Sequence, residues 1–125
     1  MNDVRNPPRR LVLVDDQPEF LELTRARLTQ GAAFEVIGEA TSGDAALTLI
    51  LELEPGPEAV LLDIEMPGLD GFETARRMRA LAPNVRIILI SASDNSRYRA
   101  AAIGIGAAFL AKRSLSAEAI LRLLD

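Results

Sequence analysis

Uninterrupted apolar runs recur along the chain and are separated by stretches of mixed polarity. A strand with one solvated face alternates apolar and polar residues, whereas a strand of a parallel sheet that is covered on both faces is apolar throughout. Such runs cover Leu11–Val14, Ala59–Leu62, Val85–Ile90 and Ala107–Ala111, and Phe34–Ala40 is a weaker fifth candidate. The pattern therefore predicts five strands in a parallel sheet with both faces buried.

The segments between these runs place apolar residues three and four positions apart, which is the spacing of an amphipathic helix. Three of the predicted helices are Pro18–Thr29, Asn95–Ile103, and Ala117–Leu124 with Ser114 or Ser116 as its cap. Another carries the apolar stripe Ala46, Leu49, Ile50 and Leu53. The remaining one begins at a capping box formed by Asp70 and Glu73. Because strand and helix alternate five times, we expect a doubly wound α/β sandwich.

Composition narrows the chemistry without changing the expected fold. The 125 residues fit one domain, and 49% apolar with 26% charged residues is a globular mixture. Cysteine and histidine are absent from the sequence, which excludes disulfides, thiolate or imidazole metal sites and an internal phosphohistidine. A net charge of −4 without any block of like charges gives no indication of nucleic-acid binding.

The ends of the chain suggest a short tail followed by the domain. Residues 1–9 are polar and contain prolines, so we expect a disordered tail there and one domain over residues 10–125. The longest apolar run, Ala100–Ala111, is too short and too interrupted by glycine to cross a bilayer. We therefore expect a cytoplasmic protein with no membrane contact.

Reactive side chains follow the predicted strands at the points where the strands end. Asp15 and Asp16 follow the first strand, Asp63 the third, Ser91 the fourth and Lys112 the fifth. In a doubly wound sheet, ligands bind beyond the carboxyl ends of the strands, near the point where strand order reverses. We therefore expect three carboxylates, one hydroxyl and one ammonium group to converge at that edge.

Three close carboxylates repel one another unless a cation lies between them. Oxygen ligands alone favour a hard ion, so Mg²⁺ (or Mn²⁺) is the expected cofactor. In such a site Asp63 would be the nucleophile for a phosphoryl group, Lys112 would neutralise that group, and Ser91 would donate a hydrogen bond to it. Lys112 is the only lysine among fourteen basic residues, and it falls where this mechanism needs an ammonium group.

Four motifs carry a family resemblance: VLVDDQPEF, VLLDIEMPGLDGFE, IILISAS and FLAK. In this order and at these spacings they resemble the receiver domains of two-component response regulators, from about Arg10 to the C-terminus. The segment ALAPNVRIILIS, and a lysine without a following proline, look most like the receivers of NarL/LuxR-type DNA-binding regulators. The resemblance implies a flavodoxin-like sheet with strand order 2-1-3-4-5 and five helices.

The resemblance also implies roles for the acidic residues. Asp63 would accept a phosphoryl group from a partner sensor histidine kinase or a histidine phosphotransfer protein, and could be phosphorylated and dephosphorylated without the chain being an enzyme with turnover. Asp16, Asp63 and the backbone carbonyl of Glu65 would be metal ligands, and Asp15 would act directly or through water.

A switch follows from the same resemblance. Ser91 and Phe109 would form the switch pair, in which the hydroxyl moves toward the phosphoryl group and the ring turns inward. The changed surface would comprise the fourth helix, fifth strand and fifth helix, including Arg97 and Tyr98. A downstream output domain or protein, which could control transcription, would read that surface, and homodimerisation through the last two helices is left open by the pattern.

The sequence departs from the receiver pattern after the lysine and before the fifth strand. Arg113 follows Lys112 where most receivers have a proline in a cis peptide, so this bond is either trans or strained. The segment IGIGAAFLAK is also one residue shorter than the usual pattern. Both departures concern the switch loop more than the acceptor chemistry.

Other functions remain to be separated from phosphoacceptance. Taken singly, each site residue has a structural explanation as a helix cap, a turn or a core residue. A receiver-like module that works by association alone is the main alternative. An aspartyl-phosphate hydrolase is disfavoured, because Glu65 stands where those enzymes have a second aspartate. A flavodoxin-like cofactor binder is rejected, because Asp15 and Asp16 would repel an anionic cofactor.

Overall fold

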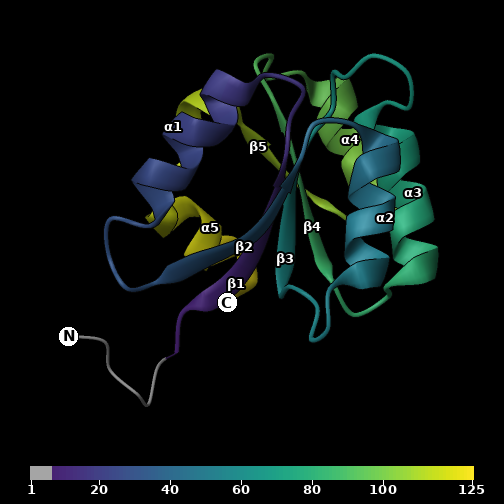
Figure 1. The fold of residues 1–125 in the computed structure, drawn as a ribbon. Helices are drawn as coiled ribbons and strands as arrows, with labels where there is room; N and C mark the ends of the chain where they lie inside the picture. Colours follow the sequence, from purple (N-terminus) through teal and green to yellow (C-terminus); the bar gives the residue numbers. More distant parts are fainter. Residues whose placement is uncertain (1–6) are drawn as a thin grey trace.

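A five-stranded parallel sheet lies between two layers of helices in the computed structural model, which describes residues 7–125 (Figure 1). The strands are β1 (Arg9–Val14), β2 (Phe34–Ala40), β3 (Ala59–Asp63), β4 (Arg86–Ser91) and β5 (Ala108–Ala111). The helices are α1 (Pro18–Leu28), α2 (Gly43–Glu52), α3 (Gly71–Leu81), α4 (Ser96–Ile105) and α5 (Ala117–Leu124), with a 3-10 turn over Lys112–Ser114. The strand order is β2-β1-β3-β4-β5, which confirms the predicted fold.

The apolar side chains of the strands pack into two separate cores, one on each face of the sheet. Along β1, Leu11 and Leu13 pack with α1 and α5, whereas Val12 and Val14 pack with α2, α3 and α4. Successive side chains of a strand point to opposite faces, so a strand needs apolar residues at every position to supply both cores. Helices cover both faces of the sheet (Figure 1), and this requirement explains why the strands read as uninterrupted apolar runs.

Side-chain caps fix where four of the helices begin. Ser42, Asp70, Asn95 and Ser116 each accept a hydrogen bond from a backbone N–H of the first turn that follows. Such a cap satisfies a donor that the helix itself leaves unpaired and contributes about 1 kcal/mol. Ser116, rather than Ser114, is therefore the cap of α5. Helix α1 instead begins with Pro18, as the sequence predicts.

Strand ends differ from the predicted ranges by one or two residues. β3 extends by one residue, and β4 begins and ends one residue later than predicted, so Asp63 and Ser91 are the last residues of their strands. β1 begins earlier than predicted, because Arg9 and Arg10 pair with β2. Residues 1–6 lie outside the described residues, so the predicted tail over residues 1–9 stays a prediction there, whereas Arg9 already belongs to the sheet.

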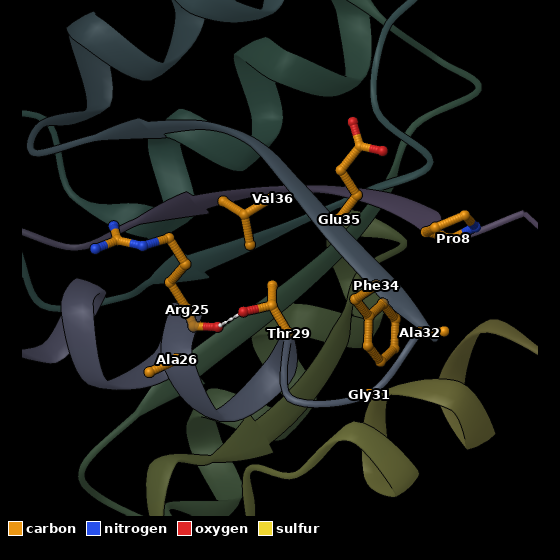
Figure 2. Close-up of a pocket in the computed structure, with 9 residues that line it drawn as sticks. All are labelled: Pro8, Arg25, Ala26, Thr29, Gly31, Ala32, Phe34, Glu35 and Val36. Carbon is orange, nitrogen blue, oxygen red and sulfur yellow. Dashed lines mark hydrogen bonds between the residues drawn. The ribbon is translucent and has the colours of Figure 1, made fainter. Parts of the chain in front are cut away.

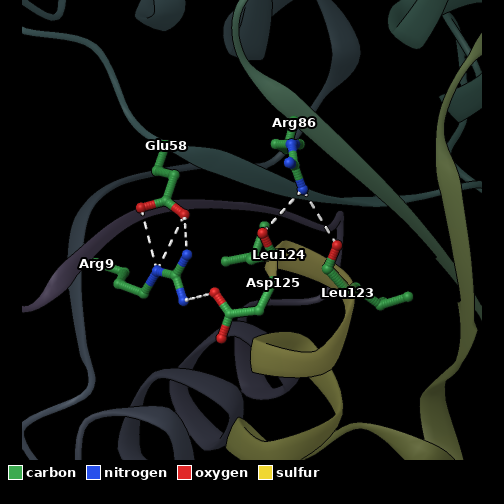
Figure 3. A network of polar contacts seen from close by, with 6 residues as sticks. All are labelled: Arg9, Glu58, Arg86, Leu123, Leu124 and Asp125. Carbon is green, nitrogen blue, oxygen red and sulfur yellow. Dashed lines mark hydrogen bonds and ion pairs between the residues drawn. The ribbon is translucent and has the colours of Figure 1, made fainter.

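Two arginines bind the end of α5 at the edge of the sheet where β1 and β4 begin (Figure 3). The Arg9 guanidinium pairs with Glu58 at 2.8 Å and with Asp125 at 2.7 Å. Arg86 Nη1 donates to the carbonyls of Leu123 at 3.2 Å and Leu124 at 3.1 Å. A cation at a helix C-terminus compensates the partial negative charge of its free carbonyls. These contacts hold α5 against the starts of β1 and β4.

The β3–α3 connection returns very close to the strand it leaves. Gly71, the first residue of α3, donates its N–H to the Ile64 carbonyl at 2.9 Å. A Cβ atom at Gly71 would lie 2.3 Å from the Asp63 carbonyl oxygen and 2.6 Å from the Ile64 Cα. Only glycine therefore allows α3 to begin directly against the backbone of Asp63.

No helix within residues 7–125 is long and apolar enough to cross a membrane.

The contact at Gly71 gives a first testable expectation. Gly71→Ala should lower the free energy of unfolding by about 2 kcal/mol or more, because backbone atoms must move to admit the methyl group. The matched control is Gly104→Ala in α4, where a Cβ would meet no atom within 4 Å. Urea unfolding of both variants measures the difference. Equal stabilities would show that the β3–α3 connection relaxes without cost.

Candidate functional site

The carboxyl ends of four strands bring the predicted reactive residues to one edge of the sheet. Asp15 and Asp16 follow β1, Asp63 ends β3, Ser91 ends β4 and Lys112 follows β5. Adjacent parallel strands in register place their ends side by side: Val14 pairs with Leu62, and Asp63 with Ile90. The structure therefore brings together all five side chains that the strand ends indicate.

Asp15, Asp16 and Asp63 form an acidic pocket in which one carboxylate oxygen of each residue lies within 4.8 Å of the others. Asp15 is 1% exposed and Asp63 3% exposed, whereas Asp16 is half-buried. The two deepest carboxylates are thus withdrawn from water while Asp16 still reaches it. Asp15 Oδ1 also accepts a hydrogen bond from the Gln17 backbone N–H at 2.9 Å, which fixes the orientation of the Asp15 carboxylate.

Lys112 supplies the positive charge next to this pocket. Its Nζ lies 2.8 Å from Asp15 Oδ2 and 3.6 Å from Asp63 Oδ1, and it sits 4.2 Å from the centre of the Phe20 ring. The ring shields one side of the ammonium group from water and is attracted to its charge. The ammonium group is therefore held between the two buried carboxylates, closer to Asp15.

Asp63 is the least satisfied group in the site. Its Oδ1 is buried and has no hydrogen-bond partner in the described part of the chain. Burial, with the neighbouring charge of Asp15 as a second cause, raises the pKa of Asp63 from 3.8 to about 6, although Lys112 opposes this shift. A buried carboxylate whose charged form is disfavoured gains from any cation that approaches it.

The donor set fits a hard divalent cation. Three carboxylates and one ammonium group leave a net negative charge, and Asp63 Oδ1 has no hydrogen-bond partner in the described part of the chain, only the ammonium group of Lys112 at 3.6 Å. The pocket opens into a cavity of about 230 Å³ lined by Asp16, Gln17, Asp63, Glu65, Ala92 and Lys112. Oxygen ligands of this kind suit Mg²⁺, which keeps several of its waters and therefore needs such room.

Ser91 is buried and fully engaged in the structure. Its Oγ donates to Glu65 Oε1 at 2.6 Å and accepts from the Ser93 backbone N–H at 3.0 Å. The side chain of Glu65 therefore takes part in the site, whereas the sequence indicates only its backbone carbonyl. No motif shows this contact, because it depends on how the β3–α3 connection lies against the end of β4.

Phe109, the second member of the predicted switch pair, is buried under an arginine. The Arg99 guanidinium lies 4.7 Å from the centre of the Phe109 ring. Asp94 holds that guanidinium at 2.8 Å and also pairs with Arg113 at 2.9 Å. The hydrogen bond from Arg99 is the main reason that the pKa of Asp94 is lowered. Asp94 therefore links α4 to the turn after β5.

Neither Arg99 nor Asp94 is among the site residues that the sequence predicts. The one signal was an acidic residue just before α4 with an arginine five positions later. The peptide bond between Lys112 and Arg113 is trans, because the only cis peptide bond within residues 7–125 joins Glu54 and Pro55. The departure from proline is thus accommodated by an ordinary 3-10 turn.

A larger cavity, of about 440 Å³, lies along the edge strand β2 and the end of α1 (Figure 2). Two of its lining residues already have polar partners: Arg25 pairs with Glu39, which lies outside the lining, and the Thr29 hydroxyl donates to the Arg25 carbonyl at 2.7 Å. Glu35 is exposed at its rim. This cavity has no cluster of converging reactive groups, so the acidic pocket is the candidate site.

Comparisons with known proteins agree with this geometry. The sequence profile described as the response regulator receiver domain matches residues 11–124. The chain is 39% identical over 117 residues to the probable transcriptional regulatory protein NarL of Mycobacterium tuberculosis, covering 93% of this chain and 53% of that protein. The chain thus spans about half the length of the curated relatives that it matches first.

Solved structures give the same result. The signal receiver domain of NarL from Mycobacterium tuberculosis has a TM-score of 0.84 at 36% identity, covering 94% of this chain and 97% of that one. The complex of CheX and CheY with beryllium trifluoride and magnesium, from Borrelia burgdorferi, has a TM-score of 0.83 at 26% identity, covering 98% of this chain and 90% of that one.

The raised pKa of Asp63 predicts how stability depends on pH when no divalent cation is present. The folded protein binds the Asp63 proton more tightly than the unfolded chain, so this proton stabilises the fold at low pH. That stabilisation is lost as pH rises from 3.8 to about 6. Asp63→Asn removes the titrating group, and should therefore be more stable than wild type at neutral pH by roughly 3 kcal/mol. The difference should shrink toward zero near pH 4.

Urea unfolding in a chelator, at several pH values, measures this difference. Asp70→Asn is the matched control, because Asp70 is exposed, and asparagine also caps a helix. Magnesium chloride should raise the Tm of wild type more than that of Asp63→Asn, since a ligand that binds only the folded state stabilises it. A stability difference that does not vary with pH would contradict the assigned environment of Asp63.

Proposed function

Because the chain belongs to the response regulator receiver domain family, we propose that it is a phosphorylation-controlled signalling switch whose phosphoacceptor is Asp63. The observation that carries this proposal is the convergence of the acidic pocket with Lys112 and Ser91 on one cavity. The phosphoryl group would come from the phosphohistidine of a partner kinase or phosphotransfer protein, because this sequence contains no histidine.

Transfer of the phosphoryl group to Asp63 needs an ionised carboxylate and nearby positive charges. A carboxylate oxygen of Asp63 forms the new bond to phosphorus while the bond from phosphorus to the donor nitrogen breaks. With a pKa of about 6, Asp63 is mostly ionised at neutral pH, so the nucleophile is available. Positioning and charge neutralisation supply most of the rate enhancement in such reactions.

Metal binding would be divided among four ligands. Asp16, Asp63 and the Glu65 carbonyl would hold Mg²⁺, with Asp15 acting directly or through water, and the opening beside Asp16 would admit the ion. A bound magnesium ion would neutralise charge on Asp63 and on the incoming phosphoryl oxygens. The related CheY structure from Borrelia burgdorferi contains magnesium together with beryllium trifluoride, which supports this choice of ion.

Lys112 would change partners when the phosphoryl group arrives. Its ammonium group is already 3.6 Å from Asp63 Oδ1, so a small movement away from Asp15 would bring it to a phosphoryl oxygen. A lysine is a compact point charge on a flexible stem, which suits such a transfer between acceptors. The exchange would pull on the turn after β5, where Arg113 pairs with Asp94.

The readout would be the α4-β5-α5 surface, including Arg97 and Tyr98. Ser91 and Phe109 would connect that surface to the site, because Phe109 is covered by Arg99 and Arg99 is tied to Asp94 in the loop after Ser91. Similarity over about half of a transcriptional regulatory protein supports an output in transcription, exerted by a part outside this segment. The segment itself would bind no nucleic acid and would work in the cytoplasm.

Acetyl phosphate labelling tests the proposal. Wild type should acquire one acid-stable, base-labile phosphoryl group in the presence of magnesium and none in a chelator, as measured by phosphate-affinity electrophoresis and intact-mass spectrometry. Asp63→Asn should remain unlabelled, because the nucleophile is gone. Asp70→Asn, in the same β3–α3 connection, is the matched control and should be labelled like wild type.

Two outcomes would count against the proposal in different ways. Labelling of Asp63→Asn at the wild-type rate would move the phosphoacceptor to another residue. A wild type that is never labelled, by acetyl phosphate or by any histidine-phosphorylated donor, would favour a module that acts by association alone.

A further inference from the structure

The hydroxyl group of Ser91 has both of its hydrogen-bonding functions occupied. Its single hydrogen goes to Glu65 Oε1 at 2.6 Å, and its oxygen accepts from the Ser93 backbone N–H at 3.0 Å. Ser91 is fully buried at the end of β4, whereas Glu65 is exposed, so the bond between them joins the interior to the surface of the site. A serine hydroxyl has only one hydrogen to donate. It can therefore serve Glu65 or another acceptor in the site, but not both.

Glu65 is placed where an incoming anion would meet it. Its side chain lines the same cavity as Asp63 and Lys112. Within residues 7–125 its carboxylate forms no ion pair, and the Ser91 hydroxyl is its one side-chain hydrogen-bond partner. A phosphoryl group on Asp63 would thus compete with Glu65 for the hydroxyl and would also repel the Glu65 carboxylate.

From this arrangement, and resting on the proposed phosphoacceptor function, we infer that the Glu65 side chain is a positioning residue that holds Ser91 back in the unphosphorylated state. A hydrogen bond from a hydroxyl to a charged carboxylate is stronger than one between neutral groups. Breaking it therefore adds to the free energy that the switch requires. The phosphoryl group replaces Glu65 as the acceptor. Glu65 therefore sets how readily the switch closes.

The same exchange has a route to the output surface. The Ser93 N–H bonds to the Ser91 oxygen, and Asp94, the next residue, holds Arg99 over the Phe109 ring. A movement of the Ser91 hydroxyl toward Asp63 disturbs the bond from Ser93, and hence the start of the loop that carries Asp94. Release of Glu65 and rearrangement around Phe109 are thereby parts of one process.

A double-mutant cycle with beryllium trifluoride separates this restraint from simple charge repulsion. Binding of the anion in magnesium is measured by calorimetry for wild type, Glu65→Ala, Ser91→Ala and the double variant. Removing Glu65 should tighten binding about tenfold when Ser91 is present, because the charge-assisted hydrogen bond no longer has to be broken. In the Ser91→Ala background the gain should be clearly smaller.

Glu65→Gln is the matched variant, since it keeps an acceptor oxygen but removes the charge. It should fall between wild type and Glu65→Ala, because a neutral hydrogen bond still restrains Ser91. A readout free of ligand is the Ser93 amide resonance in the chelated protein. It should shift in Glu65→Ala, because the hydroxyl then reorients, and shift less in Glu65→Gln.

The outcomes test the restraint by Glu65 and the phosphoacceptor function separately. Equal gains from Glu65→Ala with and without Ser91, together with an unmoved Ser93 amide, would overturn the restraint and leave only electrostatic repulsion. If wild type failed to bind beryllium trifluoride in magnesium, the phosphoacceptor function itself would fail. Thermal unfolding of the four proteins shows whether they share one fold, and Glu65→Gln carries the comparison if the alanine variant does not fold.

Discussion

Burial of carboxylates at one edge of the sheet is the constraint on which the site depends, and repulsion between neighbouring charges adds to it. The parallel strands place Asp15 and Asp63 next to each other and remove both from water, so the charged form of Asp63 is disfavoured first by burial and then by the charge of Asp15. Lys112 offsets part of this cost and lies nearer to Asp15, which leaves Asp63 undercompensated. A carboxylate whose charge is only partly neutralised, and which lines an open cavity, attracts cations. With a cation bound, it can react with an electrophilic phosphorus.

The sheet is predictable from the sequence because both of its faces are buried. Each strand must supply two cores, and the resulting apolar runs are visible without any structural knowledge. The reactive residues are visible for a related reason, since a polar residue directly after such a run marks a strand end. β1 shows the limit: Arg9 belongs to the strand through backbone pairing and ion pairs, neither of which produces an apolar signal.

Side-chain contacts between separate elements could not be predicted in the same way. The bond from Ser91 in β4 to Glu65, and the position of Arg99 in α4 over Phe109 in β5, depend on how these segments meet in space. Nothing in the spacing of these residues distinguishes them from solvated positions on a helix or a turn. The sequence therefore locates the groups that carry the chemistry, whereas the structure is needed to find the groups that restrain them.

Lys112 also has a practical consequence, which follows from its being the one lysine in the sequence. A sample grown with isotopically labelled lysine would give a single side-chain ammonium resonance, with no assignment needed. That group lies between Asp15 and Asp63 and over the Phe20 ring, whose ring current displaces its signal. In the purified protein, the chain thus contains a built-in spectroscopic reporter at the centre of its site.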